Sequence, residues 1–266
     1  MSDTNVSVPE ITFSGSALLG YTIEVIYCFT FNIILFFILR RKRGGYSFKP
    51  LIVGFGTYFA LSWVRQAFRA LLLTDDLKSF PAMWYITSAL LSGVIEEIGR
   101  YLAFRYALDG YDSLKDGIGY GLGHDFCEMS LGVGTKSLGF LFWGIRCNDV
   151  GVMKMITGMD ASRADAFVKK LTLAADNSVL SSLHSVIAWL PVEHILLSIL
   201  VLISVHYVGQ KKQLYIAMAI HTFWDVLTPL MLWLGIANII TVKIIPDVLL
   251  FVYVYKLWKQ LNKETV

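Results

Sequence analysis

The stretch AMWYITSALLSGVIEEIGRYLAFRYAL, residues 82–108, decides the fold. It is mostly apolar, and it is longer than the roughly 20 residues that an α-helix needs to cross a bilayer. Glu96, Glu97 and Arg100 nevertheless lie inside it. Charges within a membrane helix are costly and usually mark a functional site or an ion pair. The stretch therefore predicts a membrane helix that carries functional groups.

The composition of the whole chain supports a membrane protein. Of its 266 residues, 56% are hydrophobic and only 16% are charged, whereas soluble domains carry roughly 25% charged residues. A soluble fold would have too little polar surface to cover itself, so we expect the lipid bilayer as partner. The net charge of +3 argues against nucleic acid. The widely spaced cysteines indicate neither a disulfide framework nor a thiolate zinc site.

Seven apolar runs have the length of membrane helices. We therefore expect an all-α polytopic membrane protein, with one integral membrane domain over residues 1–266 and a four-helix catalytic core within 82–235. The polar segment 146–178 predicts an extracytoplasmic loop with an amphipathic surface helix. The runs are about 17–39, 50–73, 82–108, 117–145, 179–208, 213–235 and 237–257.

Basic residues in short loops predict the orientation. They follow the first, fifth and seventh runs, so we expect the N-terminus outside and the C-terminus in the cytoplasm, in a plasma membrane. These residues are Arg40, Arg41, Lys42, Arg43 and Lys49, then Lys211 and Lys212, then Lys256, Lys259 and Lys263.

Ionisable residues of three runs fall at similar depths. At 1.5 Å per residue from the cytoplasmic ends, Glu96 lies roughly 15 Å deep, His124 roughly 10 Å and His221 roughly 12 Å. Residues spaced i,i+4 share one face of a helix. Such pairs are Glu96 with Arg100, His124 with Glu128, and His221 with Asp225.

Imidazoles and carboxylates at one depth suit metal-assisted or carboxylate-assisted hydrolysis. Neutral imidazoles bind zinc, and a free carboxylate can take a proton from water. Because the HExxH signature of soluble zinc proteases is absent, the ligands would come from separate helices. Arg100 could hold one carboxylate ionised while the other acts.

At EEIGR (96–100), YGLGH (120–124) followed by Glu128, and HTFWD (221–225), the chain resembles a known superfamily. These are the type II CAAX prenyl-proteases and bacteriocin-processing membrane proteins, and the YhfC-like branch of intramembrane metalloproteases is the most similar. The resemblance covers the third to sixth runs and implies a metalloendopeptidase that cleaves a peptide or membrane-protein substrate.

The resemblance also implies roles for residues. It makes Glu96 or Glu97 the base that activates water, with Arg100 beside them. The first motif is one residue shorter than in the prenyl-proteases, so which glutamate is catalytic stays open. The implied ligands of a metal, zinc by this resemblance, are His124, His221, Asp225 and Glu128.

Other functions stay open for the same residues. One is a non-catalytic membrane scaffold or immunity protein of the same fold that binds a peptide or a partner subunit. Another is a proton- or ion-coupled transporter, since carboxylates and histidines also form relays. The chain shows no repeat symmetry of the transporter kind. A polar network that only locks helices together is the structural alternative.

Further polar residues lie deeper in the predicted helices. Glu24, Arg65 and Glu193 fall roughly 21–23 Å from the cytoplasmic ends, so we expect an ion-pair cluster among them. His184 and His194 lie nearer the outer side, and we expect them to be interfacial or satisfied by hydrogen bonds rather than ligands.

Glycines in the fourth run predict close helix packing. Gly117 with Gly121, and Gly119 with Gly123, have the GxxxG spacing of membrane helix contacts. We expect this face to bring the fourth run, with His124, against the third.

Overall fold

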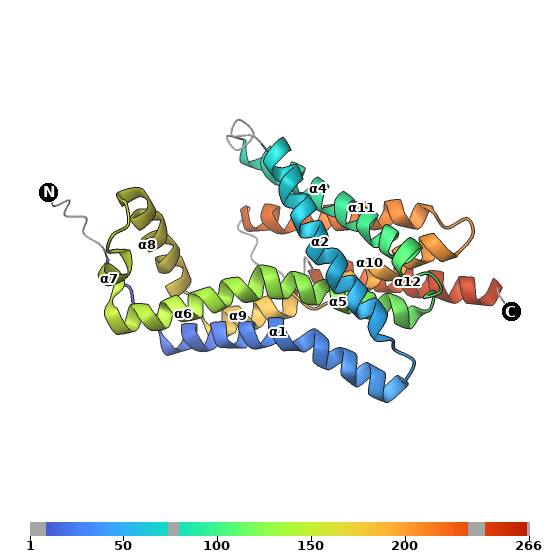
Figure 1. Cartoon of the computed structure of the whole chain (residues 1–266), viewed down its shortest axis with the longest axis horizontal. Helices are drawn as coiled ribbons and strands as arrows, with labels where there is room; N and C mark the ends of the chain where they lie inside the picture. Colours follow the sequence, from blue (N-terminus) through green and yellow to red (C-terminus); the bar gives the residue numbers. More distant parts are fainter. Residues whose placement is uncertain (1–8, 74–79, 234–242, 265–266) are drawn as a thin grey trace. The chain divides into compact units, whose positions relative to one another are not determined.

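The computed structural model describes residues 9–73, 80–233 and 243–264 (Figure 1). All regular secondary structure in these ranges is helical, which confirms the predicted all-α fold. The helices are α1 (Gly15–Arg43), α2 (Phe48–Leu72), α4 (Pro81–Leu102), α5 (Leu114–Glu128), α6 (Thr135–Val150), α7 (Val152–Ile156), α8 (Ala161–Ala175), α9 (Val179–Ala188), α10 (Val192–His206), α11 (Lys212–Trp233) and α12 (Ile245–Glu264), with π-helical turns at Ala103–Ala107 and Met129–Gly134.

Helices occupy the predicted runs, but the fifth run is broken. It forms α9 and α10, because Pro191 at the start of α10 lacks the N–H that a continuing helix needs. The seventh run was predicted from residue 237, and residues 237–242 lie outside the described residues. Among the described residues, Gly15–Arg43 and Val179–His206 are long and apolar enough to cross a membrane. The number of spans stays a prediction.

The chain forms two compact units. The first comprises Met1–Phe31 and Met129–Trp189, and the second comprises Asn32–Glu128 and Leu190–Val266. The single integral membrane domain expected from the sequence stays a prediction.

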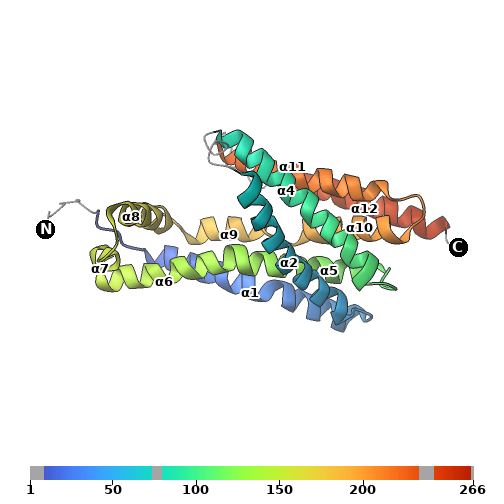
Figure 2. The same ribbon diagram turned by 45° about the horizontal axis from the view of Figure 1, so that its top comes forward.

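The first unit packs the N-terminal part of α1 against α6, α8 and α9. Phe13, Tyr21, Phe140 and Leu171 form its buried core, and the Tyr21 hydroxyl donates a hydrogen bond of 2.9 Å to a carbonyl at the end of α8. Figure 2 shows α7 and α8 beside one end of α6. Helix α8 occupies the segment that predicted an amphipathic helix, and the side chain of Asp160 caps its first turn.

Glu24 is buried in the first unit, where serine hydroxyls of α6 and α9 donate hydrogen bonds to it at 2.5 and 2.8 Å. In the second unit, Arg65 pairs with Glu96, and Glu193 lies 3.7 Å from Lys243. The predicted ion-pair cluster of Glu24, Arg65 and Glu193 is therefore wrong. Similar depth does not determine which helix faces a charge.

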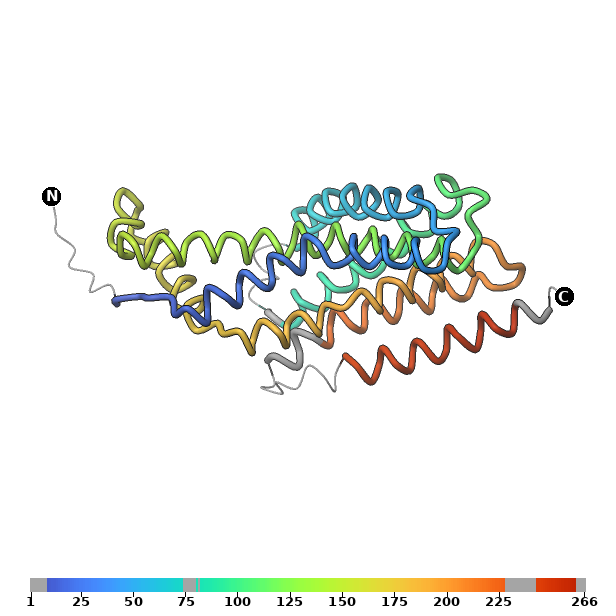
Figure 3. Tube along the Cα trace, turned by 90° about the horizontal axis from the view of Figure 1, so that it is seen from below, coloured from blue at the N-terminus to red at the C-terminus, as the bar shows by residue number. Residues whose placement is uncertain are grey.

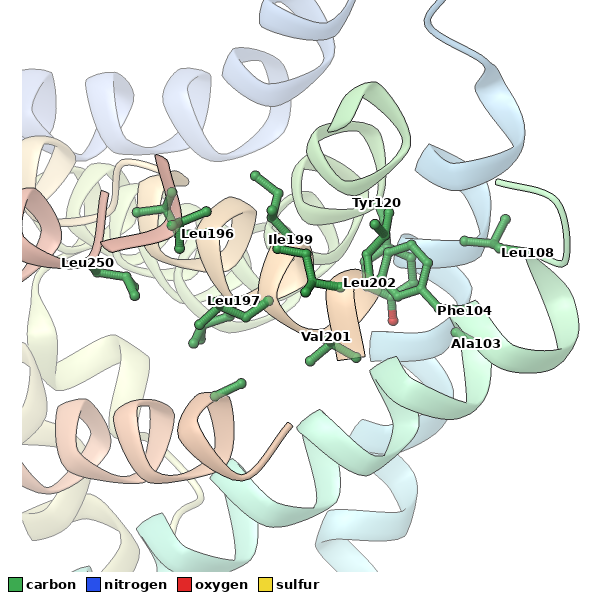
Figure 4. Close-up of a cluster of buried hydrophobic side chains, with 14 of the residues drawn as sticks. Ala103, Phe104, Leu108, Tyr120, Leu196, Leu197, Ile199, Val201, Leu202 and Leu250 are labelled. Atoms are coloured by element: carbon green, nitrogen blue, oxygen red, sulfur yellow. The ribbon is translucent and has the colours of Figure 1, made fainter. Parts of the chain in front are cut away.

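Helix α10 is the most buried helix of the second unit. It packs against α4, α5, α11 and α12, and Figure 3 shows α12 (red) running beside the orange segments. Leu197 and Leu202 of α10 are fully buried in a cluster with Phe104 and Tyr120 (Figure 4). This apolar core leaves the polar side chains of α4, α5 and α11 to face one another next to it.

Glycines let the helices of the second unit approach closely. A Cβ on Gly54 of α2 would collide with the carbonyl oxygen of Tyr120 in α5, and a Cβ on Gly123 would collide with that of Leu51 in α2. A Cβ on Gly121 would lie 2.6 Å from a Cα atom of α10. The predicted close packing of this helix is confirmed. The glycine face itself meets α2 and α10 instead of the third run, because the spacing marks a smooth helix face without identifying its neighbour. The side chain of His124 does reach the third run, at Glu96.

We expect Gly54→Ala to destabilise the protein and Gly56→Ala, two residues along the same helix, to leave it nearly unchanged. The added methyl group meets backbone at position 54, which cannot move aside, but nothing within 4 Å at position 56. Overpacking of this kind costs about 1–3 kcal/mol. Thermal unfolding in detergent measures the difference. Equal midpoints for the two variants would contradict the packing described here.

Candidate functional site

Five helices of the second unit bring ionisable side chains into one cluster, called the polar cluster below. They are α2, α4, α5, α10 and α11. Most of its side chains are buried, and Glu97, Arg100 and His124 have 0% exposed surface. Its members are Arg65, Glu96, Glu97, Arg100, His124, Asp125, Glu128, His194 and His221.

Glu96 lies at the centre of the polar cluster. Its Oε2 atom is 3.2 Å from Nε2 of His124 and 3.7 Å from Nε2 of His221. Its Oε1 atom forms an ion pair with Arg65. Side chains of α2, α5 and α11 therefore meet at one carboxylate of α4.

Glu97 has different partners from its neighbour. Its Oε1 atom is 2.6 Å from Nη1 of Arg100 and 2.7 Å from Nδ1 of His221. An Nδ1–H that donates to Glu97 leaves Nε2 of His221 as the unprotonated nitrogen, and this nitrogen faces Glu96. The two glutamates thus contact opposite sides of one imidazole ring.

Close helix contacts and aromatic rings hold the two histidines. A Cβ on Gly93 of α4 would lie 2.8 Å from the backbone nitrogen of Thr222, so α11 lies directly against α4 beside His221. The Tyr58 ring meets His124 edge-on, with centroids 5.0 Å apart. Arg65 donates a hydrogen bond of 2.9 Å to the Tyr58 hydroxyl. The orientation of His124 is therefore coupled to the arginine that pairs with Glu96.

His194 also belongs to the polar cluster, although the sequence pointed to an interfacial role. Its Nε2 atom is 3.2 Å from Oε2 of Glu128 and 3.7 Å from Oδ1 of Asp125. Asp125 is fixed from its other side by a hydrogen bond of 2.6 Å that Asn32 donates. The sequence analysis did not assign His194, Asp125 or Arg65 to the site.

The ends of the helices explain why His194 was missed. Helix α5 begins at Leu114, three residues before the predicted run, so Glu128 lies about 21 Å from its start. His194 lies about 18 Å from the last residue of α10. The two side chains therefore share a level. Pro191, which follows the end of α9 by three residues and caps the start of α10, was the sequence signal that a new helix presents residues 192–195 here.

His124, Glu128 and His194 have donor atoms that all lie within 4.8 Å of one another. Four-coordinate zinc with bonds of about 2.0–2.1 Å holds its ligand atoms roughly 3.4 Å apart, so a small inward movement suffices. The Nδ1 atoms of both histidines are buried and have no hydrogen-bond partner among the described residues. Two imidazoles and a carboxylate are a ligand set of catalytic zinc sites. These residues fit a metal ion.

The other predicted ligands lie at the edges of this group. His221 faces Glu96 and Glu97, and its ring centroid is 5.9 Å from that of His194. Asp225 lines a pocket of about 350 Å³, called the adjoining pocket below. Residues that line it include Arg65, Arg69, Ser88, Ser92, Glu128 and Asp225.

A comparison with protein families matches residues 28–246 to the YhfC intramembrane metalloprotease family. The chain belongs to this family. It is also similar to the uncharacterized membrane protein YhfC of Bacillus subtilis (strain 168), with 23% identity over 130 residues, which are 47% of this chain and 50% of that protein. The match therefore spans half the length of this relative. No solved structure matches the chain. Membership of the YhfC family, predicted from the motifs, is confirmed, and the family is one of membrane proteins.

We expect Arg100→Met to destabilise the protein strongly. It leaves the fully buried Glu97 carboxylate without its cation, and breaking a buried ion pair in this way costs about 3–5 kcal/mol. Arg105→Met is the control, because Arg105 is exposed on the adjacent π-helical turn. Thermal unfolding in detergent compares the two, and the double variant Glu97→Gln/Arg100→Met should recover part of the loss. An Arg100→Met protein as stable as Arg105→Met would exclude this role of the pair.

Proposed function

We propose that the protein is a membrane-embedded metallopeptidase in which Glu96 is the general base. The observation that supports this most directly is the position of the Glu96 carboxylate between the Nε2 atoms of His124 and His221. A carboxylate that lies 3.2 Å from one imidazole nitrogen and 3.7 Å from another, in a buried site, has what peptide-bond hydrolysis needs: a proton acceptor and polar groups aimed at the same point.

The neighbouring glutamate has a positioning role in this proposal. Glu97 accepts the Nδ1–H of His221 and is held by Arg100, so it fixes the tautomer and the ring orientation of this histidine. Arg65 holds the Glu96 carboxylate from the α2 side. These contacts support Glu96 over Glu97 as the base, and the proposal assigns that role to Glu96.

The hydrolysis follows from these positions. A water molecule attacks the carbon of the scissile carbonyl and gives a proton to Glu96. The C–N bond then breaks, and Glu96 returns the proton to the nitrogen of the leaving amine. His221, whose unprotonated Nε2 is directed at this point, is placed to accept a hydrogen bond from the attacking water and so to orient it.

A metal ion fits beside this carboxylate. His124, Glu128 and His194 would hold it, with Asp225 near Glu128 in the adjoining pocket. Zinc, when bound, would supply Lewis acidity that polarises the carbonyl oxygen. The chain's own contribution is to hold two imidazoles without competing hydrogen bonds at Nδ1, in a largely buried site.

We expect His124→Ala and His194→Ala to lower zinc affinity by more than about tenfold, because each removes a nitrogen ligand. His206→Ala is the control, since His206 is at the far end of the same helix as His194. Metal content after dialysis against a weak chelator measures the effect. If His194→Ala kept its zinc while His221→Ala lost it, the ligand set given above would be wrong.

We expect Glu96→Gln to lower the rate of peptide cleavage by about 10²–10⁴-fold while leaving the fold intact, because the amide cannot accept the proton. The substrate is a mixture of synthetic membrane-protein segments in detergent micelles, and mass spectrometry identifies new termini. Glu10→Gln, at an exposed position, is the control. Wild-type cleavage by Glu96→Gln, with metal bound, would exclude Glu96 as the base.

A non-catalytic scaffold that binds a peptide is the second candidate. The ion pairs of Glu96 with Arg65 and Glu97 with Arg100 favour it, because a structural network also needs balanced charges. A chain that neither binds zinc nor cleaves any segment of the mixture would support this reading. In both proposals the chain crosses the plasma membrane several times, with its N-terminus outside and its C-terminus in the cytoplasm.

A further inference from the structure

The adjoining pocket connects directly with the polar cluster. Arg65 and Glu128 belong to both: they line the pocket, and they contact Glu96 and His194. Its volume of about 350 Å³ is within the range of small-ligand sites. A group bound in this pocket would therefore lie next to the proposed base and the proposed metal ligands.

Most lining residues come from one end of the second unit. Arg65 and Arg69 are in the second half of α2, Ser88 is in the first half of α4 with Ser92 at its middle, and Glu128 is the last residue of α5. The chain runs toward this end in α2 and α5 and away from it in α4. Late residues of α2 and α5 therefore lie beside early and middle residues of α4.

The opposite end of the same unit carries the basic residues. The last turn of α1 contains four of them, Lys49 is in the first turn of α2, and α11 begins at Lys212. Basic residues concentrate in cytoplasmic loops. The pocket therefore lies toward the extracytoplasmic side.

Arg69 forms no ion pair among the described residues, although Asp225 of the same pocket acts on it electrostatically. Its Nη2 atom donates one hydrogen bond of 3.2 Å to the Ser92 hydroxyl, and its Nε atom is buried without a hydrogen-bond partner among the described residues. Arg65, by contrast, has both Glu96 and Tyr58. A guanidinium group inside a membrane protein needs an anionic partner, and its fork of donors suits a carboxylate.

The acidic residues of the pocket have other roles in the proposed function. Glu128 faces His194, and Asp225, which also lines the pocket, lies near Glu128 as a candidate ligand. If a metal ion takes these carboxylates, Arg69 has no remaining anionic partner among the residues that the structure describes. The pocket is then electrostatically complementary to an anionic group of a substrate.

We propose that the adjoining pocket is the substrate-binding site, that it is entered from the extracytoplasmic side, and that Arg69 binds a carboxylate of an acidic peptide segment there. The claim that the bound peptide is a substrate rests on the proposed function. Its two physical claims, the side of entry and the anion preference of Arg69, can be measured without any cleavage.

Thiol labelling tests the side of entry. In a full-length variant with Cys28, Cys127 and Cys147 replaced by alanine, Ser88→Cys places a thiol in the pocket and Asp112→Cys places one at the opposite end. We expect a membrane-impermeant anionic methanethiosulfonate to label Ser88→Cys in intact cells and Asp112→Cys only after permeabilisation. Labelling of Ser88→Cys that requires permeabilisation would overturn the extracytoplasmic route.

The charge of the reagent tests Arg69. We expect Ser88→Cys to react faster with an anionic than with a cationic methanethiosulfonate of similar size, and Arg69→Gln to lower this rate ratio roughly tenfold, the effect of one charge-assisted hydrogen bond. Arg69→Lys should keep most of the preference. An N-acetylated glutamate peptide should protect the thiol, and its glutamine twin should not.

The outcomes separate this inference from the proposed function. An unchanged rate ratio in Arg69→Gln, or equal protection by the two peptides, would show that Arg69 only balances Asp225, and would leave the Glu96 assay standing. Normal labelling and anion preference in a chain that cleaves nothing would instead support a peptide-binding scaffold with this pocket.

Discussion

The neutralisation of charge within an apolar fold is the constraint on which the second unit depends. Two adjacent glutamates of α4 are buried there, and each has its own arginine: Glu96 pairs with Arg65 and Glu97 with Arg100. Arg100 comes from the same helix, but Arg65 comes from α2, so α2 has to lie close to α4. An unpaired carboxylate at this position would cost several kcal/mol.

The neighbouring glutamates differ because successive residues of a helix point about 100° apart. Glu96 turns toward α2 and α5, whereas Glu97 turns toward Arg100. His221 bridges the two directions, with Nδ1 on Glu97 and Nε2 toward Glu96. A pair that looks redundant in the sequence therefore makes two separate sets of contacts, and the proposed chemistry uses both.

Much of this arrangement follows from the sequence, and the remainder depends on which helices become neighbours. Helical period and apolar length predicted the helices, and depth counting brought Glu96, His124 and His221 to one level, where the structure has them in contact. It failed for His194, because α5 starts earlier and α10 ends earlier than the apolar runs indicate. Likewise the partner of Arg65 depends on the packing of α2, which pattern and spacing do not encode.

The group that could hold a metal ion shows the same division. The resemblance implied His124, His221, Asp225 and Glu128 as ligands, and the structure groups His124 and Glu128, an i,i+4 pair, with His194 from a different helix. The i,i+4 spacing relates residues of one helix, so it can identify His124 and Glu128 of α5 but not His194 of α10. The position of His194 needs the crossing of α5 and α10, which a glycine face at Gly121 permits.

The backbone contacts of Gly54 and Gly123 have a consequence for how variants of this protein should be interpreted. Arg65 is carried by α2, and the distance between α2 and α5 is set by those two glycines rather than by side chains that could adapt. A methyl group at either position would move the guanidinium away from Glu96 although no reacting group had changed. In a random mutagenesis screen such positions would score as catalytic, and only a separate measurement of folding would identify them as spacers.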